Sequence, residues 1–242
     1  MARTSFFATI ALVFALSGTA FADQFYFVSP GSVIWNGVYV TPYTANDNTT
    51  HQNNLTIYCD DWNTDFSGNP TWNANVYALT AANVPDFKYG GVTSDYSLTL
   101  NSNTLSYASN PANAFDLYLE VAWLDDQLRT TNPNATQQTE LAAAMWTLFV
   151  NDSNVAGLVG AINNSGFATD VFNDLAAAKL AVSQGYNAAG WDVIVPEDNN
   201  FPMQEFLVYD GVPEPSAVVL LATIGGLLVL MTLRRRRSRS RA

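Results

Sequence analysis

The chain contains one cysteine, Cys59, and two carboxylates follow it directly, Asp60 and Asp61. A lone cysteine cannot form an intramolecular disulfide, so its thiol is either buried or chemically employed. The thiolate is the nucleophilic form, and adjacent carboxylates raise the thiol pKa because they disfavour a second negative charge. The sequence therefore predicts a buried, unreactive thiol, with a functional thiol site at Cys59 as the alternative.

Oxygen-bearing side chains alternate after this cysteine, at Asp61, Asn63 and Asp65. Carboxylate and amide oxygens two residues apart can converge on Ca²⁺ when the loop curls around the ion. An EF-hand loop has glycine at its sixth position and glutamate at its twelfth, whereas this chain has Phe66 and Trp72 there. Two interpretations stay open, a calcium site or an Asx-rich turn between strands. We expect no other cofactor.

Groups for catalysis are scarce. His51 is the only histidine, which excludes a metal-hydrolase site built on several histidines. The adjacent acids Asp60 and Asp61, or Asp125 and Asp126, could serve an acid-dependent glycan hydrolase. Neighbouring carboxylates are also common on solvated surfaces, and neither pair has further support in the sequence. We therefore expect that the protein is not an enzyme.

The first part of the chain is strand-like, because its apolar residues are mostly aromatic or β-branched. Asn36 and Gly37 interrupt one such run, and this dipeptide is typical of a tight hairpin turn. The predicted strands span residues 25–28, 33–40, 55–59, 76–79 and 98–100.

The middle of the chain changes to a helical period. Trp123 and Trp146 lie on apolar stripes, which favours packing in a core over a sugar-stacking surface. Asn134 and Gln137 resemble a capping box, and Gly185 is placed to end a helix. The helices are predicted from Pro111 onward and at residues 136–150 and 169–183, and strands return at 192–195 and 205–209. This order predicts an α+β fold, a strand-rich domain with a segregated helical insertion.

Residues 1–22 have the three parts of a secretory signal peptide. Arg3 supplies a positive charge, residues 6–16 form a mostly apolar run, and Ala20 and Ala22 stand before the cleavage site. We expect signal peptidase to cleave after Ala22, so that the mature chain is exported.

Residues 217–233 form an uncharged run at the other end of the chain, 17 residues long. At ~1.5 Å per residue this run makes a helix of ~25 Å, enough for a bilayer core. Basic residues follow at once, and the positive-inside rule keeps them in the cytoplasm: Arg234, Arg235, Arg236 and Arg237. The sequence therefore predicts one C-terminal transmembrane helix, with the preceding domain outside the cytoplasm.

Residues 23–212 remain as an acidic globular domain, long enough for one core. They hold 20 acidic and three basic residues, a formal charge of −17. The electrostatic field of such a negative charge repels polyanions, so nucleic acid is excluded as a partner of this domain.

The C-terminal order of features resembles the PEP-CTERM sorting signal. Pro213, Glu214 and Pro215 precede the apolar run and the arginine cluster, and the resemblance covers residues 212–242. It implies recognition by exosortase, a membrane-embedded cysteine transpeptidase, with cleavage near these prolines. It also implies anchoring in the inner membrane before processing and a later place in the cell envelope, at the surface or outside the cell. Both prolines hold the backbone out of a helix, which suits a peptide-cleaving enzyme.

The globular part resembles thioester-type domains of surface adhesins over residues 36–149. The similarity is carried by residues 58–62 around Cys59 and by the helix with Trp146. In those domains a strand cysteine bonds to a glutamine four residues before a tryptophan. Ala142 occupies that position here, so the resemblance implies a surface domain without a thioester.

These features predict an exported, non-catalytic protein of the cell surface or the exopolysaccharide matrix. The expected partners are signal peptidase, exosortase, exopolysaccharide, and the membrane through the C-terminal helix. Two alternatives stay open. One is a surface binding protein, either carbohydrate-binding or a thioester-type adhesin, and the other is a glycan hydrolase.

Overall fold

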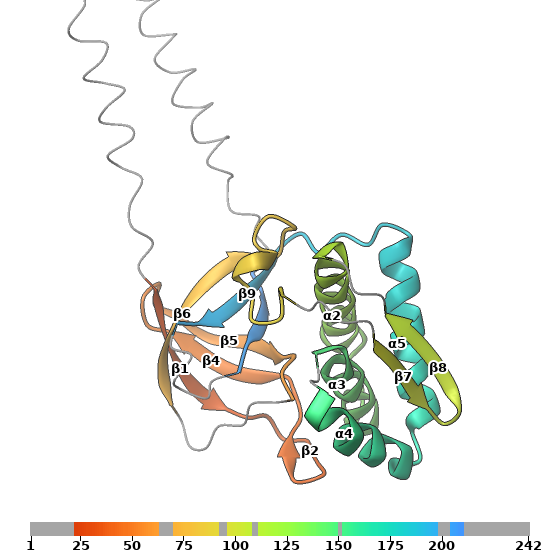
Figure 1. Cartoon of the computed structure of the whole chain (residues 1–242). Helices are drawn as coiled ribbons and strands as arrows, with labels where there is room; N and C mark the ends of the chain where they lie inside the picture. The colour runs from red at the N-terminus through yellow and green to blue at the C-terminus, as the bar shows by residue number, and fades with distance from the viewer. Residues whose placement is uncertain are drawn as a thin grey trace, which may run out of the picture.

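The computed structural model describes residues 22–62, 70–91, 96–107, 111–149, 152–197 and 204–210. In these residues a closed antiparallel barrel stands beside a group of α-helices (Figure 1). Strands come before and after the helices in the chain. The predicted α+β class with a helical insertion is therefore confirmed for the described residues.

Six strands close the barrel in the order β1-β4-β5-β10-β9-β6, and β6 pairs back with β1. The two strands that follow the helices therefore fill the gap between β5 and β6, which holds the ends of the domain together. The barrel strands are β1 (Asp23–Ser29), β4 (Tyr43–Asp47), β5 (Gln52–Cys59), β6 (Thr71–Ala78), β9 (Trp191–Pro196) and β10 (Phe206–Tyr209).

The two faces of these strands belong to two cores. Alternate residues such as Phe25, Ile57 and Phe206 fill the barrel interior, as the two-residue period of a strand requires. Their neighbours Tyr58 and Leu207 point outward and join the larger core that the helices share. One wall of the barrel is thus buried on both faces, which ties the barrel to the helices.

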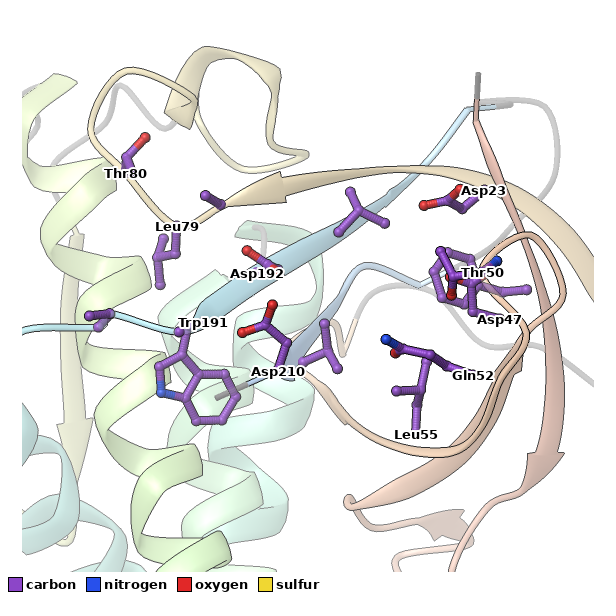
Figure 2. Close-up of a pocket in the computed structure, with 17 residues that line it drawn as sticks. Asp23, Asp47, Thr50, Gln52, Leu55, Leu79, Thr80, Trp191, Asp192 and Asp210 are labelled. Atoms are coloured by element: carbon purple, nitrogen blue, oxygen red, sulfur yellow. The ribbon is translucent and has the colours of Figure 1, made fainter. Parts of the chain in front are cut away.

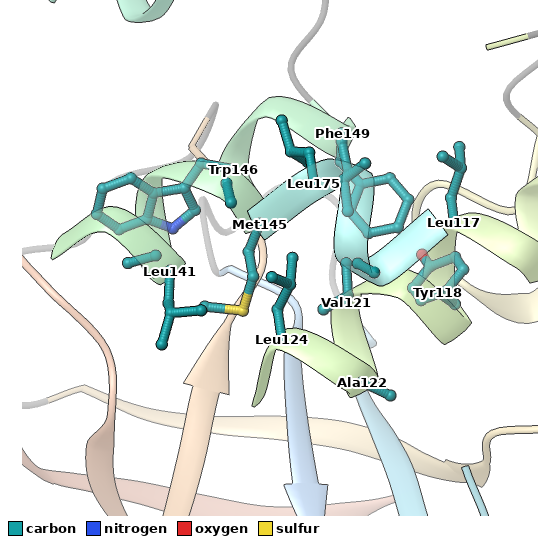
Figure 3. Packing of buried hydrophobic residues seen from close by; sticks show 14 of the residues in the cluster. Leu117, Tyr118, Val121, Ala122, Leu124, Leu141, Met145, Trp146, Phe149 and Leu175 are labelled. Carbon is teal, nitrogen blue, oxygen red and sulfur yellow. The ribbon is translucent and has the colours of Figure 1, made fainter. Parts of the chain in front are cut away.

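The helical layer comprises α2 (Pro111–Thr131), α3 (Ala135–Phe149), α4 (Asp152–Ser165) and α5 (Ala168–Ser183). Helix α2 contacts both α3 and α5. Figure 3 shows Leu124 of α2 and Met145 of α3 within the shared core. Trp146 is also buried there, as its position on an apolar stripe predicts, and Trp123 packs partly buried against the same core.

Helix ends follow the local signals in the sequence. The side-chain oxygen of Asn134 accepts hydrogen bonds from the amides of Thr136 and Gln137, and Gln137 Oε1 accepts one from the Asn134 amide. The predicted capping box is confirmed, and α3 begins at Ala135. Gly185 has a φ of +89° directly after α5, where a left-handed residue ends a helix.

Two small hairpins lie outside the barrel. Strands β2 (Ile34–Trp35) and β3 (Val38–Tyr39) meet at Asn36 and Gly37, which have φ of +50° and +84°. The predicted turn is confirmed, and its strands form a separate hairpin. The second hairpin, β7 (Tyr96–Leu100) with β8 (Asn103–Tyr107), packs on α5, and a short 3₁₀ helix η1 (Val84–Asp86) follows β6.

Besides the short helix η1, three described elements were not expected from the sequence: β4, β8 and α4. Strand β4 ends in Asn46 and Asp47, which are residue types typical of a turn, and Asp47 even occupies an inward position. The local sequence therefore does not indicate a strand here. Helix α4 contains Gly157 and Gly160, which lower helix propensity. It forms because Leu158 and Ile162 are fully buried in the shared core, so tertiary packing outweighs propensity.

No helix among the described residues is both long enough and apolar enough to cross a membrane. The predicted signal peptide up to position 21, the transmembrane helix at residues 217–233 and the sorting element at residues 213–215 lie outside the described residues. The arginine cluster at residues 234–237 also lies there, so these features stay predictions.

Candidate functional site

Cys59 lies at the helix-facing end of the barrel, and its thiol belongs to the barrel core. The residue is 1% exposed. Its backbone amide donates to Thr41 Oγ1 at 3.1 Å, and its thiol donates to the Asp61 carbonyl at 3.4 Å. Burial raises the pKa of the Cys59 thiol well above its ordinary value, and the charges of Asp61 and Asp60 raise it further. The predicted buried thiol is confirmed.

Helix α3 reaches this cysteine through Trp146. The indole Nε1 of Trp146 donates to the Cys59 carbonyl at 3.1 Å, which fixes the helix against the end of β5. Ala142 is fully buried in the same helix and has no acyl group to offer.

A glutamine that sequence reasoning missed lies beside this cysteine. Gln204 Nε2 donates to the Asp61 carbonyl at 3.2 Å, the same oxygen that the Cys59 thiol contacts. Gln204 is buried just ahead of β10. No spacing rule links residues this far apart in sequence, and only closure of the barrel brings β10 against β5.

Buried charges surround the same end of the barrel. The Asp61 carboxylate pairs with Lys88 Nζ and accepts a hydrogen bond from Tyr89 at 2.5 Å. The Glu205 carboxylate accepts one from the Tyr118 hydroxyl at 2.5 Å and one from the Lys88 amide at 2.7 Å. Burial raises the pKa of Glu205 to about 7, although these hydrogen bonds oppose the rise. This network joins β5, β10, α2 and the loop after η1.

Two carboxyl groups have no hydrogen-bond partner among the described residues, Asp60 and Asp125, and both are fully buried. Burial raises the pKa of each well above its ordinary value, and neighbouring carboxylates raise it further. Burial disfavours the charged form of a carboxyl, so both groups favour their protonated form more than an exposed carboxyl does. The two predicted acid pairs are thus split: Asp60 and Asp125 are sequestered, while Asp126 pairs with Arg129 at 2.8 Å.

Of the proposed calcium ligands, only Asp61 lies among the described residues, since Asn63 and Asp65 fall outside them. The Asp61 carboxylate is engaged by Lys88 and Tyr89. Within the described ranges, no group of three or more His, Cys, Asp or Glu residues is arranged to hold a metal ion. Calcium at this loop stays a prediction.

A cavity of about 540 Å³ occupies the opposite end of the barrel (Figure 2). It continues the barrel interior, because Phe25 and Val208 of the barrel core, and Leu55 packed against that core, line it. Its walls carry apolar groups and also hydroxyl, amide and carboxylate groups. The polar lining residues are Asp23, Asp47, Thr50, Gln52, Thr80, Asp192 and Asp210.

Asp47 is fixed at this mouth by its own turn. Its carboxylate accepts hydrogen bonds from the amides of Thr49 and Thr50 at 2.8 and 3.1 Å and from the Thr50 hydroxyl at 2.5 Å. Asp23 lies nearby on β1, and burial followed by the charge of Asp47 raises the pKa of its carboxyl. None of the lining residues is Lys or Arg, so the cavity is acidic.

The sequence-predicted residues are therefore distributed over two places. The structure brings Cys59, Asp60 and Asp61 together at the end of the barrel where β5 finishes, opposite the cavity. None of the three lines the cavity. The four acids of the cavity were not singled out in the sequence. The feature that marks these acids is an inward position in a strand or directly after one. It can be recognised only when the register of the strands is known.

Comparisons with known proteins give one structural likeness. No protein-family model matches the chain, and no curated protein matches it either. Among solved structures, the N-terminal domain of the Streptococcus pyogenes pilus tip adhesin Cpa is similar, with 10% sequence identity, over 80% of this chain and 95% of that chain. The TM-score of 0.41 does not establish a common fold.

Proposed function

We propose that this chain is an exported, non-catalytic protein of the cell surface or the exopolysaccharide matrix, processed at its C-terminus by exosortase. Export is supported by the signal-like residues 1–22, and sorting by Pro213, Glu214 and Pro215 ahead of an apolar run and an arginine cluster. Delivery is the function that these segments serve.

One structural observation carries the non-catalytic part of the proposal. Cys59, Asp60 and Asp125 are at most 1% exposed, and none of them lines the cavity. A nucleophile or a general acid must come within hydrogen-bond reach of its substrate. The enclosure of these three groups supports a non-catalytic role.

A second candidate, a surface binding protein, is favoured by the open cavity at the barrel mouth. A concave site with a few polar groups on an apolar floor is the common form of a ligand pocket. Binding to a sugar array and to exopolysaccharide from an exosortase-bearing host would support this second function. If the protein binds neither the sugar array nor the exopolysaccharide, the binding function is refuted and only the delivery function stays proposed.

Processing is tested in a host that has exosortase. Mass spectrometry of the mature protein should find a C-terminal peptide that ends between Val212 and Ser216. Replacing Pro213 and Pro215 with Ala should slow processing, because the apolar helix can then extend toward the domain. A mature population that keeps the whole arginine tail in such a host would refute processing.

Catalysis is tested separately with polysaccharide substrates. We expect no turnover by the purified protein. Turnover that is abolished by Asp60→Asn or Asp125→Asn, and kept in the surface variant Asp86→Asn, would overturn the non-catalytic assignment in favour of a glycan hydrolase.

A further inference from the structure

The mouth of the barrel breaks the apolar pattern of its own interior. Phe25, Ile194 and Val208 are inward-facing and buried, and the next inward positions toward the mouth are Asp23, Asp192 and Asp210. A small barrel is normally filled by apolar side chains. Asp23 and Asp192 are partly buried, which costs desolvation free energy, whereas Asp210 is exposed. Departures of this kind from local rules gather at functional sites.

The four acids form two pairs on opposite sides of the mouth. Asp23 and Asp47 belong to the adjacent strands β1 and β4, and we call them the first pair. Asp192 of β9 and Asp210, which follows β10, form the second pair. Figure 2 shows the two pairs on either side of the cavity.

Apolar side chains separate the two pairs. In the closed order of strands, β5 lies between β4 and β10, and β6 lies between β9 and β1. These intervening strands contribute Leu55, Val76 and Ala78 to the lining, together with the amide side chain of Gln52. The cavity therefore has an acidic pair on each side and a mainly apolar middle, in which Gln52 is the one polar side chain from these two strands.

This arrangement excludes most ligand classes. Anions are repelled, since acidic residues line the cavity without any Lys or Arg. A single metal ion would need several ligands at one point, and the described residues contain no such group. The aromatic lining residues Phe25 and Trp191 are each 2% exposed, so neither offers an open ring face on which a sugar could stack.

We propose that the barrel mouth binds a small organic dication, an aliphatic diamine or polyamine, with one ammonium group at each acidic pair and its methylene chain across the apolar middle. Charge-assisted hydrogen bonds from ammonium to carboxylate are the strong class of such bonds. Burial raises the pKa of the Asp23 carboxyl, and the charge of Asp47 raises it further, so a cation beside Asp23 would relieve that repulsion. The cavity of about 540 Å³ has room for the ligand and bridging waters.

The test is isothermal titration of the full-length chain, purified in a neutral detergent, at physiological ionic strength. Putrescine, cadaverine and spermidine are compared with butylamine and butanediol, which have one amino group and none. We expect the best diamine or polyamine to bind at least about tenfold more tightly than butylamine, because only it engages both pairs. Butanediol should bind most weakly.

Matched variants locate the site. Asp23→Asn in the first pair and Asp210→Asn in the second should each lower the affinity for the best ligand by about tenfold. The surface variant Asp86→Asn removes the same charge outside the cavity and should leave the affinity unchanged. If Asp210→Asn fails to fold, Asp192→Asn replaces it in the second pair, and circular dichroism of each variant confirms the fold.

Four results would overturn the inference. They are no measurable binding, equal binding of butylamine and the diamines, tighter binding of butanediol, or an equal loss of affinity in Asp86→Asn. The last would mean that polyamines are attracted by the net charge alone. None of these outcomes bears on C-terminal processing, so the inference and the proposed function fail independently.

Discussion

At the scale of single residues, several carboxyl groups of the domain are held away from water. Burial raises the pKa of Glu120 on α2 to about 7, and that of Glu205 also to about 7. Because the folded state binds these protons more tightly than the unfolded chain, the associated stability is present below the ordinary pKa of 4.5 and is lost as pH rises through about 7.

We therefore predict that the melting temperature falls by about 5 °C or more between pH 5 and pH 8, since one unit of pKa shift is about 1.4 kcal/mol. Differential scanning calorimetry measures this fall. Glu120→Gln keeps an acceptor for the Tyr107 hydroxyl, which contacts Glu120 at 3.3 Å, and should flatten the pH profile.

The control for this profile is salt. General repulsion among surface acids is screened in ~0.5 M NaCl, whereas the effect of buried carboxyls persists. Asp86→Asn, at an exposed position, should not change the slope. A melting temperature that stays constant or rises from pH 5 to pH 8 would contradict the assignment.

The second prediction at this scale concerns Cys59. The native protein should show no mass deficit of ~17 Da, the ammonia lost when an amide and a thiol form a thioester. The thiol should react with a thiol reagent only after unfolding, because it is buried and its pKa is raised. Intact mass and thiol titration measure both properties.

Gln204 makes this mass measurement more informative, since it contacts the same carbonyl oxygen as Cys59. A deficit that disappears in both Cys59→Ala and Gln204→Ala would establish a thioester that the sequence pattern does not indicate. Retention of a deficit in both variants would place the modification elsewhere.

At the scale of secondary structure, α3 depends on local signals as well as packing. Asn134 and Gln137 satisfy backbone amides at its start. Asn134→Ala should lower the free energy of unfolding by about 1 kcal/mol, the usual worth of such a cap. Urea denaturation measures this, and Asn173→Ala at an exposed position of α5 should be neutral or slightly stabilising. An equal loss in both variants would refute a capping role.

At the scale of the whole molecule, the barrel and helices share one buried wall. Tyr58 and Leu207 of the barrel belong to the same core as Leu124 and Met145 of the helices, and Trp146 adds a hydrogen bond across the boundary. Neither layer can bury its apolar face without the other.

We therefore predict that the two layers unfold together. Calorimetry should show one transition, and Trp146→Ala, which removes buried volume at the boundary, should destabilise the protein by about 3 kcal/mol or more. The midpoint of unfolding should shift by the same amount whether it is followed by near-ultraviolet or by far-ultraviolet circular dichroism. Two separate transitions, or loss of helix with the barrel intact, would contradict a shared core.

The sequence by itself determined the features that depend on neighbouring residues. These are the α+β class, the helices α3 and α5 with their signals at Asn134 and Gly185, and the turn at Asn36 and Gly37. Each follows from side-chain period or backbone geometry over a few residues. Burial of Cys59 was also predicted, since a lone cysteine between apolar and acidic residues has few alternatives.

Tertiary structure alone decided which distant residues meet. Strand β4 and helix α4 carry polar or glycine residues that argue against them locally, and packing overrides that preference. Gln204 reaches Cys59, and Asp210 reaches Asp192, only because β9 and β10 close the barrel after the helices. Strand register sets whether an acid faces solvent or the interior, and a shift of one residue would reverse it. For this reason the acidic cavity belongs to the fold and could not be found from spacing in the sequence.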